Sequence, residues 1–390
     1  MQIEKNKPQL PAITIGSAEV TAARLAFFVP GFIVSTWAPL IPVVKARLEL
    51  GADVLGLLLL CIGITAFIVM PFGAMLGQRL GCKKVLWLTC SVMALDIVTL
   101  SCLPNIWSYA VALCIFGACM GTTEVMMNTN AVVVEQLDGR RLMSGMHAFW
   151  SIGCFASAGL FALLASTGLD ATIIAIIHCI ITFAIIGYFG RHWLNYRSPG
   201  GEKAFAIPHG IVIIIGILAC ISFLVEGAIM DWSGVLLTEA KHIDMSLAGT
   251  GYAIFSVAML VMRLIGDKAV QTLGEKTAVI GGSLLTAVGF AMLVLVDNLY
   301  LNGLSFIIIG IGCSNIVPVF YSILKFQKAM PISAAVTAVT SLGYSGVIMG
   351  PALLGFVAHG LGINAVFELL LILLLIEAAI AKLVFNRLKM

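Results

Sequence analysis

An acidic side chain stands in the middle of a long apolar run, where a charge is costly. The stretch GTTEVMMNTN, residues 121–130, places Glu124 and the amide Asn128 inside an apolar run from about residue 109 to residue 134. On a helix these two side chains share one stripe with Gly117 and Gly121, because successive residues are about 100° apart. A carboxyl group at this depth can bind and release a proton, so Glu124 is the first candidate for proton coupling and Asn128 for solute binding. A hydrogen bond between helices is the alternative role for Glu124.

A second acid lies in the stretch LVEGAIMDWSG, residues 224–234. Glu226 is the deeper of its two acids and is the second candidate for proton coupling. Asp231 and Trp232 lie nearer the expected outer side, and we assign them to solute binding. Trp37 is assigned to solute binding as well, by stacking of its ring on a sugar-like molecule. For both tryptophans the alternative is the aromatic belt at the membrane interface, and for Asp231 it is an outer-gate or interfacial position.

Further polar residues interrupt other apolar runs. Asn315 stands in GIGCSNIVP, residues 310–318, between glycines and a helix-kinking proline. Ser341 and Tyr344 share a hydroxyl-rich helix face with Thr337, which suits either a polyhydroxylated ligand or hydrogen bonds between helices. His147 is a candidate proton relay because imidazole titrates near neutral pH, with a structural hydrogen bond as the alternative.

The elements that must position these residues are membrane helices. Of the 390 residues 61% are hydrophobic and 11% are charged, and the mean hydropathy is +1.08, which is far more apolar than a soluble domain. Hydropathy predicts twelve runs long enough to cross a bilayer. They lie near residues 21–44, 54–76, 84–103, 107–134, 144–167, 170–192, 209–237, 246–265, 277–296, 300–324, 332–358 and 362–386.

The distribution of basic residues predicts the orientation. Most Lys and Arg residues fall on one set of alternating loops, whereas the opposite set carries Lys45, Arg47 and Lys241. By the positive-inside rule both termini are cytoplasmic, which requires an even number of spans. The first twenty residues have no long apolar core and are expected to form a cytoplasmic tail. No N-x-[ST] acceptor occurs in a loop, which agrees with a bacterial inner membrane.

The twelve runs divide into two sets of six. The longest polar break after the tail covers residues 191–210, at the midpoint of the chain, and an offset of about 195 residues superposes Trp37 on Trp232 and Gly117 on Gly312. The predicted fold is therefore all-α, with twelve transmembrane helices in two pseudo-symmetric halves. The predicted domains are a tail at 1–20, a six-helix half at 21–193, a linker at 194–208 and a second half at 209–390.

One loop resembles a signature of the major facilitator superfamily. GAMLGQRLGCKK, residues 73–84, is similar to the family pattern G-x-x-x-D-R-x-G-R-K, with Gln78 in place of the acid and Arg79 at the arginine. Gln271 holds the related place in the second half. In the family the acid of this loop helps to latch the two halves in the outward-open state, and the resemblance implies gating roles for these three residues. Arg263, at the cytoplasmic end of its run, is expected to be a gate or an anchor.

A broader resemblance covers most of the chain. The stretches FFVPGFIVSTWAPLIP, FGACMGTTEVMMNTNAVVVE, MHAFWSIG and EGAIMDW look like the YbjJ/MosC-like branch of the superfamily, which is distantly similar to the fucose permease group. The resemblance implies a secondary transporter, and a rhizopine or sugar-like solute. Symport with protons is the leading hypothesis, and the expected partners are the solute, protons and the bilayer, with the protein functional as a monomer.

Other classes are less well supported. No G-x-x-x-x-G-K-[ST] motif indicates ATP use, and no cluster of residues indicates an enzyme, a metal or a cofactor. The ten cysteines act as small hydrophobes, and nothing suggests nucleic acid. Proton-coupled efflux is the runner-up, although its G-x-x-x-G-P motif is absent from the fifth run and a similar GVIMGP occurs at 346–351. A solute sensor without transport is the third alternative.

Overall fold

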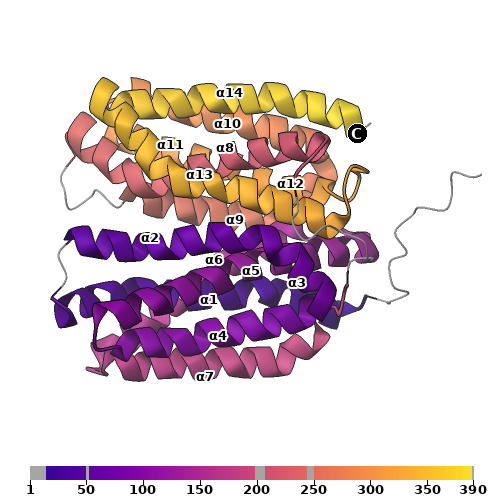
Figure 1. The fold of residues 1–390 in the computed structure, drawn as a ribbon. Coiled ribbons are helices and arrows are strands. Elements are labelled where there is room, and N and C mark those ends of the chain that lie inside the picture. Colours follow the sequence, from indigo (N-terminus) through magenta and orange to yellow (C-terminus); the bar gives the residue numbers. More distant parts are fainter. Residues whose placement is uncertain (1–14, 50–51, 198–206, 244–249, 389–390) are drawn as a thin grey trace, which may run out of the picture. The chain divides into compact units, whose positions relative to one another are not determined.

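The computed structural model of the chain describes residues 15–49, 52–197, 207–243 and 250–388, and all regular elements in this part are helices. Of the predicted tail, residues 1–14 lie outside the described residues, as do residues 198–206 of the predicted linker. Figure 1 shows long helices that run alongside one another, which is the arrangement expected of membrane spans.

Each predicted apolar run is occupied by one or more helices. In the first part of the chain these are α1 (Ser17–Arg47), α2 (Ala52–Val69), η1 (Met70–Phe72), α3 (Gly73–Leu80), α4 (Cys82–Cys102), α5 (Ile106–Asp138), α6 (Met143–Ser166), α7 (Ala171–Phe189) and η2 (Gly190–His192). In the second part they are α8 (Ile211–Val235), η3 (Leu236–Ala240), α9 (Thr250–Leu273), α10 (Glu275–Leu295), α11 (Leu299–Cys313), α12 (Ile316–Ile323), α13 (Ile332–Leu361) and α14 (Ile363–Leu388). The prediction of an all-helical membrane protein is confirmed.

Within the described part, ten helical segments are long and apolar enough to cross a membrane, and one of them, Leu299–Ile323, comprises α11 and α12. The predicted run near 54–76 is divided among α2, η1 and α3, and its short apolar part covers residues 60–72. The predicted run near 246–265 corresponds to α9, which also carries Arg263, Asp267 and Lys268. These two runs are helical but are not among the ten.

Side chains at the helix ends explain several boundaries. Asn105 accepts a hydrogen bond from Ser108 N at 3.0 Å and so caps α5, and Asp170 caps α7 through Thr172 N at 2.8 Å. Such caps satisfy N–H groups that have no partner within the helix. Gly81 joins α3 to α4 with a φ of +86°, a conformation that L side chains rarely adopt.

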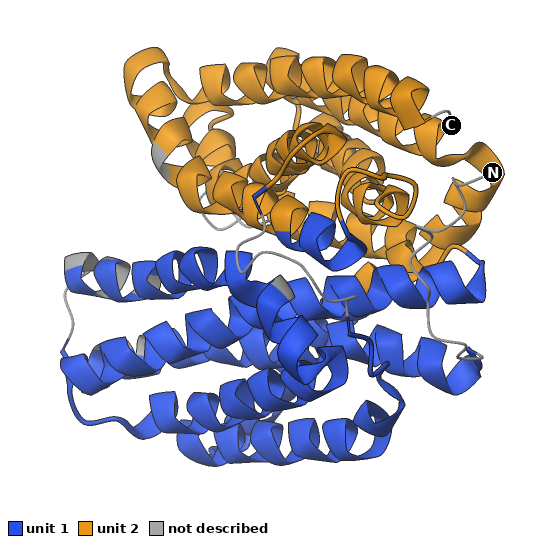
Figure 2. Cartoon of the chain, turned by 45° about the vertical axis from the view of Figure 1, so that its right-hand side comes forward, with its two compact units in different colours: residues 1–140, 149–207, 331–337 blue, residues 141–148, 208–330, 338–390 orange. Residues whose placement is uncertain are grey.

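The chain forms two compact units, coloured separately in Figure 2. Unit 1 comprises residues 1–140, 149–207 and 331–337, and unit 2 comprises residues 141–148, 208–330 and 338–390. Thus α6 begins in unit 2 and continues in unit 1, whereas α13 begins in unit 1 and continues in unit 2. The predicted division into halves at 21–193 and 209–390 stays a prediction.

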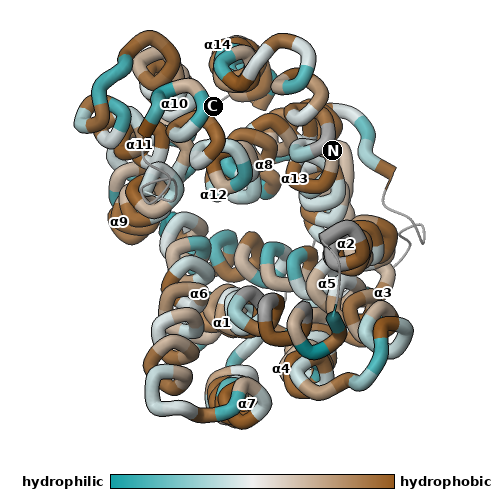
Figure 3. The backbone as a smooth tube through the Cα atoms, turned by 90° about the vertical axis from the view of Figure 1, so that its left-hand side faces the viewer, coloured by the Kyte–Doolittle hydropathy of each residue, from teal (hydrophilic) through white to brown (hydrophobic). Residues whose placement is uncertain are grey.

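Apolar residues run through the helices of both units, with hydrophilic positions between them (Figure 3). Many large apolar side chains are exposed, among them Leu163 at 63%, Ile180 at 62% and Phe356 at 77%. A water-soluble surface rarely carries so many, whereas lipid tails solvate them well. We therefore expect these exposed apolar side chains to face lipid.

Close approach of two helices organises unit 1. A Cβ atom built on Gly117 would lie 2.3 Å from the carbonyl oxygen of Ile62, and one on Gly121 would lie 2.6 Å from that of Ala66. Only glycine at these positions lets α5 lie directly against α2. Of the four residues in the predicted stripe, Gly117 and Gly121 therefore serve the packing of α5 against α2.

Candidate functional site

In unit 1, Glu124 and Asn128 form one polar pair on α5. The Asn128 amide donates to the Glu124 backbone carbonyl at 2.9 Å and to Glu124 Oε2 at 3.1 Å. Both residues are buried, with exposed fractions of 1% for Asn128 and 9% for Glu124. The Asn128 Oδ1 atom accepts no hydrogen bond from the described residues. The pair therefore joins a carboxyl group to an amide oxygen that can still accept a hydrogen bond.

In unit 2, Glu226 and Arg263 form an ion pair between α8 and α9. Arg263 Nη2 lies 3.2 Å from Glu226 Oε1 and 3.3 Å from Oε2. The side chain of Arg263 is 8% exposed and that of Glu226 is 20% exposed. Two residues that the sequence assigned to different roles, coupling and gating, are thus brought together. Because the arginine stays charged, a proton that binds Glu226 removes the charge with which Arg263 pairs.

A proline explains how Arg263 is held at its other side. In a continuous helix the carbonyl of Ser314 would accept a hydrogen bond from the N–H of residue 318, but Pro318 has no N–H. The structure breaks the predicted run at this point into α11 and α12. The released Ser314 carbonyl instead accepts a hydrogen bond from Arg263 Nε at 3.0 Å. The guanidinium is therefore fixed by a backbone oxygen and a carboxylate.

Asn315 lies at the same break. Its amide nitrogen donates to Ser314 Oγ at 2.9 Å, and its Oδ1 atom, in a residue that is 6% exposed, has no partner among the described residues. A Cβ atom on Gly266 would come within 2.1 Å of that oxygen, so glycine is required in α9 for the amide to fit.

His147 belongs to a row of aromatic and hydroxyl groups in unit 2. Its ring lies 6.0 Å from that of Tyr321 with an interplanar angle of 26°, and Tyr321 Oη lies 3.0 Å from Thr340 Oγ1. The row contains groups that can exchange protons, which keeps the relay role of His147 as a hypothesis.

The other residues assigned to solute binding are less closely grouped. Trp37 is 6% exposed and packs on Tyr109, with 5.8 Å between ring centroids, inside unit 1. The ring of Tyr344 packs on that of Phe223, with 5.9 Å between ring centroids, and Asp231 is exposed. The Nε1 atom of Trp232 and the Oγ atom of Ser341 are buried and have no hydrogen-bond partner among the described residues.

The three residues to which the family loop gives gating roles are exposed or partly exposed. Gln78 is half-buried on α3, Arg79 is exposed there, and Gln271 is exposed on α9. Their gating roles stay a prediction.

The sequence analysis did not identify Asp267. Its carboxylate accepts hydrogen bonds from the backbone N–H groups of Ser144 at 2.9 Å and Gly145 at 3.1 Å, within unit 2. These N–H groups lie in the first turn of α6, and the preceding Leu142 has no side-chain acceptor to cap them. An uncapped helix start is visible in the sequence and could have prompted a search for a distant acid. Nearby, Arg141 forms an ion pair with Glu275 at the start of α10.

A second residue outside the predicted site is Glu377. It is fully buried on α14, and its Oε1 atom accepts a hydrogen bond from Ser222 Oγ of α8 at 2.6 Å. Its Oε2 atom has no partner among the described residues. Among the described residues of the whole chain, no group of three or more His, Cys, Asp or Glu residues could hold a metal ion.

Residues 23–324 match the family model of the Major Facilitator Superfamily. An uncharacterized MFS-type transporter of Yersinia pestis is 37% identical over 372 residues, which cover 95% of this chain and 97% of the relative. The membrane protein MosC of Rhizobium meliloti is 26% identical over 350 residues, or 88% of this chain and 85% of MosC. The resemblance to the MosC-like branch is confirmed.

Solved structures show the same fold. The transporter FucP in its outward conformation superposes with a TM-score of 0.73 at 13% identity, covering 93% of this chain and 98% of FucP. The human organic anion transporter MFSD10 superposes with a TM-score of 0.72 at 14% identity, covering 93% and 99% of the two chains. At these identities the likeness concerns the fold alone.

Proposed function

Because the chain belongs to the Major Facilitator Superfamily and is a membrane transporter, we propose that it carries a small polar solute together with protons. The solute is a sugar, a polyol or an amino-sugar-like molecule, and transport proceeds by alternating access. The protein works as a monomer in a bacterial inner membrane, with both termini in the cytoplasm. Glu226 and Glu124 bind the protons.

The observation that carries this proposal is the ion pair between Glu226 and Arg263. A buried ion pair is stable only while both partners keep their charges, and breaking it by removing one charge is costly. When Glu226 takes up a proton, Arg263 Nη2 loses its acceptor and needs another one. A hydroxyl or carboxylate oxygen of the solute can replace it, so that proton binding and solute binding favour each other.

Unpaired polar atoms support a hydroxyl-bearing solute. In unit 2 the described residues include an open acceptor, Asn315 Oδ1, an open donor, Trp232 Nε1, and the hydroxyl of Ser341, which can do both. Buried polar atoms usually have partners. A molecule with several hydroxyl groups supplies donors and acceptors for such a set, whereas a lipophilic cation supplies few.

The relatives support the proposal by analogy. One of the similar solved structures is that of the fucose:proton symporter FucP of E. coli, at 12% identity. The curated relatives belong to Yersinia pestis and Rhizobium meliloti, which are bacteria. Sugar transport is an activity of FucP, and its extension to this chain is part of the proposal.

The proposal is tested with purified protein in liposomes that contain a pH-sensitive dye. A panel of sugars, polyols and amino sugars is first screened for ligands that raise the melting temperature, since a ligand of the folded state stabilises it. The best ligand is then added outside the liposomes, and acidification of the lumen is measured. Solute-driven proton uptake is expected in the wild type and is expected to be lost in Glu226→Gln.

Glu368→Gln is the matched control, because Glu368 is an exposed acid on α14. Uptake of solute without proton movement, or full proton coupling in Glu226→Gln, would contradict the proposal. Binding without any uptake would identify a sensor instead.

Proton-coupled efflux is the second candidate. The motif GVIMGP at residues 346–351 lies in α13, with Pro351 inside the helix. A Cβ atom on Gly346 would lie 2.3 Å from the carbonyl oxygen of Cys220, so this part of α13 packs directly on α8. Stabilisation by lipophilic cations alone in the ligand screen would favour efflux.

A further inference from the structure

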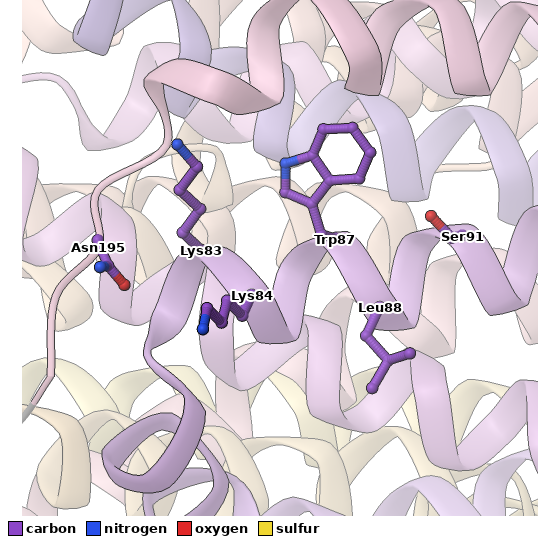
Figure 4. A pocket seen from close by; sticks show the side chains of 6 residues that line it. All are labelled: Lys83, Lys84, Trp87, Leu88, Ser91 and Asn195. Atoms are coloured by element: carbon purple, nitrogen blue, oxygen red, sulfur yellow. The ribbon is translucent and has the colours of Figure 1, made fainter.

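A pocket of about 610 Å³ lies on unit 1 at the beginning of α4. It lies on a different face of α4 from Cys82 and Thr89, which form hydrogen bonds with α5. Figure 4 shows its lining, which consists of Lys83, Lys84, Trp87, Leu88 and Ser91 on α4 and Asn195 on the segment after η2.

The charge of this pocket is positive. Two of its six lining residues are lysines and none is acidic. Lys83 Nζ donates to the backbone carbonyl of Arg191, which fixes the ammonium group, and Lys84 is exposed. Arg197 adds a third cation to the same turn, since its Nε atom would lie 3.5 Å from a Cβ atom on Gly81. An ammonium group that is held in place retains N–H groups for an anion.

The position of the lysines on the helix is unusual in electrostatic terms. Lys83 and Lys84 stand in the first turn of α4, where the helix dipole favours acidic side chains. The N-cap residue Gly81 supplies no side-chain acceptor for the free N–H groups of that turn. An anion at this end would therefore meet two ammonium groups and the positive end of the helix.

An apolar stripe continues from the charged end of the pocket. Lys84, Leu88 and Leu95 lie within about 40° of one another around α4, over a rise of roughly 16 Å. Leu88 and Leu95 are each 54% exposed. One leaflet of a bilayer has a hydrocarbon thickness of about 15 Å. Trp87 stands between the charged and apolar parts, where aromatic rings of membrane proteins are common.

From the juxtaposition of these parts we propose that the pocket binds an anionic phospholipid. The phosphate group binds Lys83 and Lys84, the Asn195 amide hydrogen-bonds the polar head, and an acyl chain lies along Leu88 and Leu95. Soluble phosphate shares the chemistry of the head but makes no use of the apolar stripe. A zwitterionic lipid brings a positive charge that the lysines disfavour.

The test is native mass spectrometry of the purified full chain, titrated with phosphatidylglycerol or phosphatidylcholine. The wild type is expected to bind phosphatidylglycerol the more tightly, and the double variant Lys83→Gln/Lys84→Gln is expected to lose roughly tenfold to thirtyfold of that affinity. The charge-matched control is Lys325→Gln/Lys328→Gln, on the segment after α12, which is expected to stay within about twofold of the wild type. Equal binding of the two lipids, or equal losses in the two double variants, would overturn the proposal.

Two further experiments distinguish binding of a phospholipid from binding of a soluble phosphate. Glycerol phosphate, which has the head but no chain, is expected to compete poorly, and Leu88→Ser is expected to weaken lipid binding while the lysines are intact. Competition by glycerol phosphate at the concentration of the lipid would overturn the proposed role of the stripe. Melting temperatures in lipid-free detergent verify that each variant is folded, so a loss of binding is not a loss of structure.

Discussion

Asp267 in α9 caps the start of α6 by accepting hydrogen bonds from the backbone N–H groups of Ser144 and Gly145. The two partners are more than a hundred residues apart in the sequence, and both lie in unit 2. The contact replaces the local cap that the sequence before α6 lacks. A carboxylate that accepts from two N–H groups forms charge-assisted hydrogen bonds, which are stronger than neutral ones.

Removal of this cap is expected to destabilise the protein. Asp267→Ala leaves two N–H groups without an acceptor and is expected to cost about 1–3 kcal/mol of folding free energy. The measurement is the melting temperature in detergent. Lys268→Gln is the control, since Lys268 is the exposed neighbour on the same helix. An unchanged melting temperature in Asp267→Ala would show that water or another residue takes over the cap.

The ion pair of unit 2 is expected to behave as one energetic unit. Arg263→Gln leaves Glu226 without its partner and is expected to cost about 3–5 kcal/mol. In the double variant Arg263→Gln/Glu226→Gln no charge remains, so the loss is expected to be smaller than the sum of the two single losses. A double-mutant cycle of unfolding free energies measures this coupling. Additive losses would mean that the two side chains do not interact.

The packing of α5 against α2 is expected to tolerate no side chain at Gly117. A Cβ atom there would meet Ile62 O and Thr65 Oγ1 at 2.3 Å each, so Gly117→Ala must force the helices apart. Overpacking of this kind costs about 1–3 kcal/mol. Gly159 in α6 is the matched control because a Cβ atom on it meets nothing within 4 Å. Gly159→Ala is expected to be neutral or stabilising by up to about 1 kcal/mol, since alanine favours helix more than glycine does.

The loop between α10 and α11 is expected to contribute stability that depends on pH. Lys241 Nζ donates to Asp297 Oδ1 at 2.6 Å, and this hydrogen bond together with the lysine charge lowers the pKa of Asp297 below its ordinary value. A carboxyl group with a lowered pKa in the folded protein stabilises it above the unfolded pKa, and this contribution is lost as the pH falls through the folded pKa. The Asp297 side chain is 79% exposed, so the contribution is small.

Asp297→Asn is therefore expected to lower the melting temperature slightly at neutral pH and to converge with the wild type in acid. Melting curves from neutral pH to about pH 3 measure the difference, below the ordinary pKa of aspartate. A difference that grows toward acid would contradict the sign of this pKa shift. Asp170→Asn is not a suitable control, because Asp170 caps α7; exposed Glu368 serves instead.

Hydropathy was sufficient to predict the helices, because the bilayer requires every span to be long, apolar and internally hydrogen-bonded. The break between α11 and α12 was also foreseeable, since Pro318 follows Asn315 within one turn. The pairing of Glu226 with Arg263 was not. It depends on how α8 and α9 are rotated about their axes, and a single sequence does not contain that rotation. For the same reason Gly117 could be expected to face a helix or a ligand, but α2 could not be named.

The missing N–H of Pro318 has a consequence for a transport cycle. Pro318 offers the Ser314 carbonyl no N–H, and Arg263 Nε occupies that carbonyl instead. In the proposed cycle this hydrogen bond is expected to hold the guanidinium in place while Glu226 is neutral. An imino acid, which carries no charge and exchanges no proton, would thereby keep Arg263 in position for the return of the carboxylate charge.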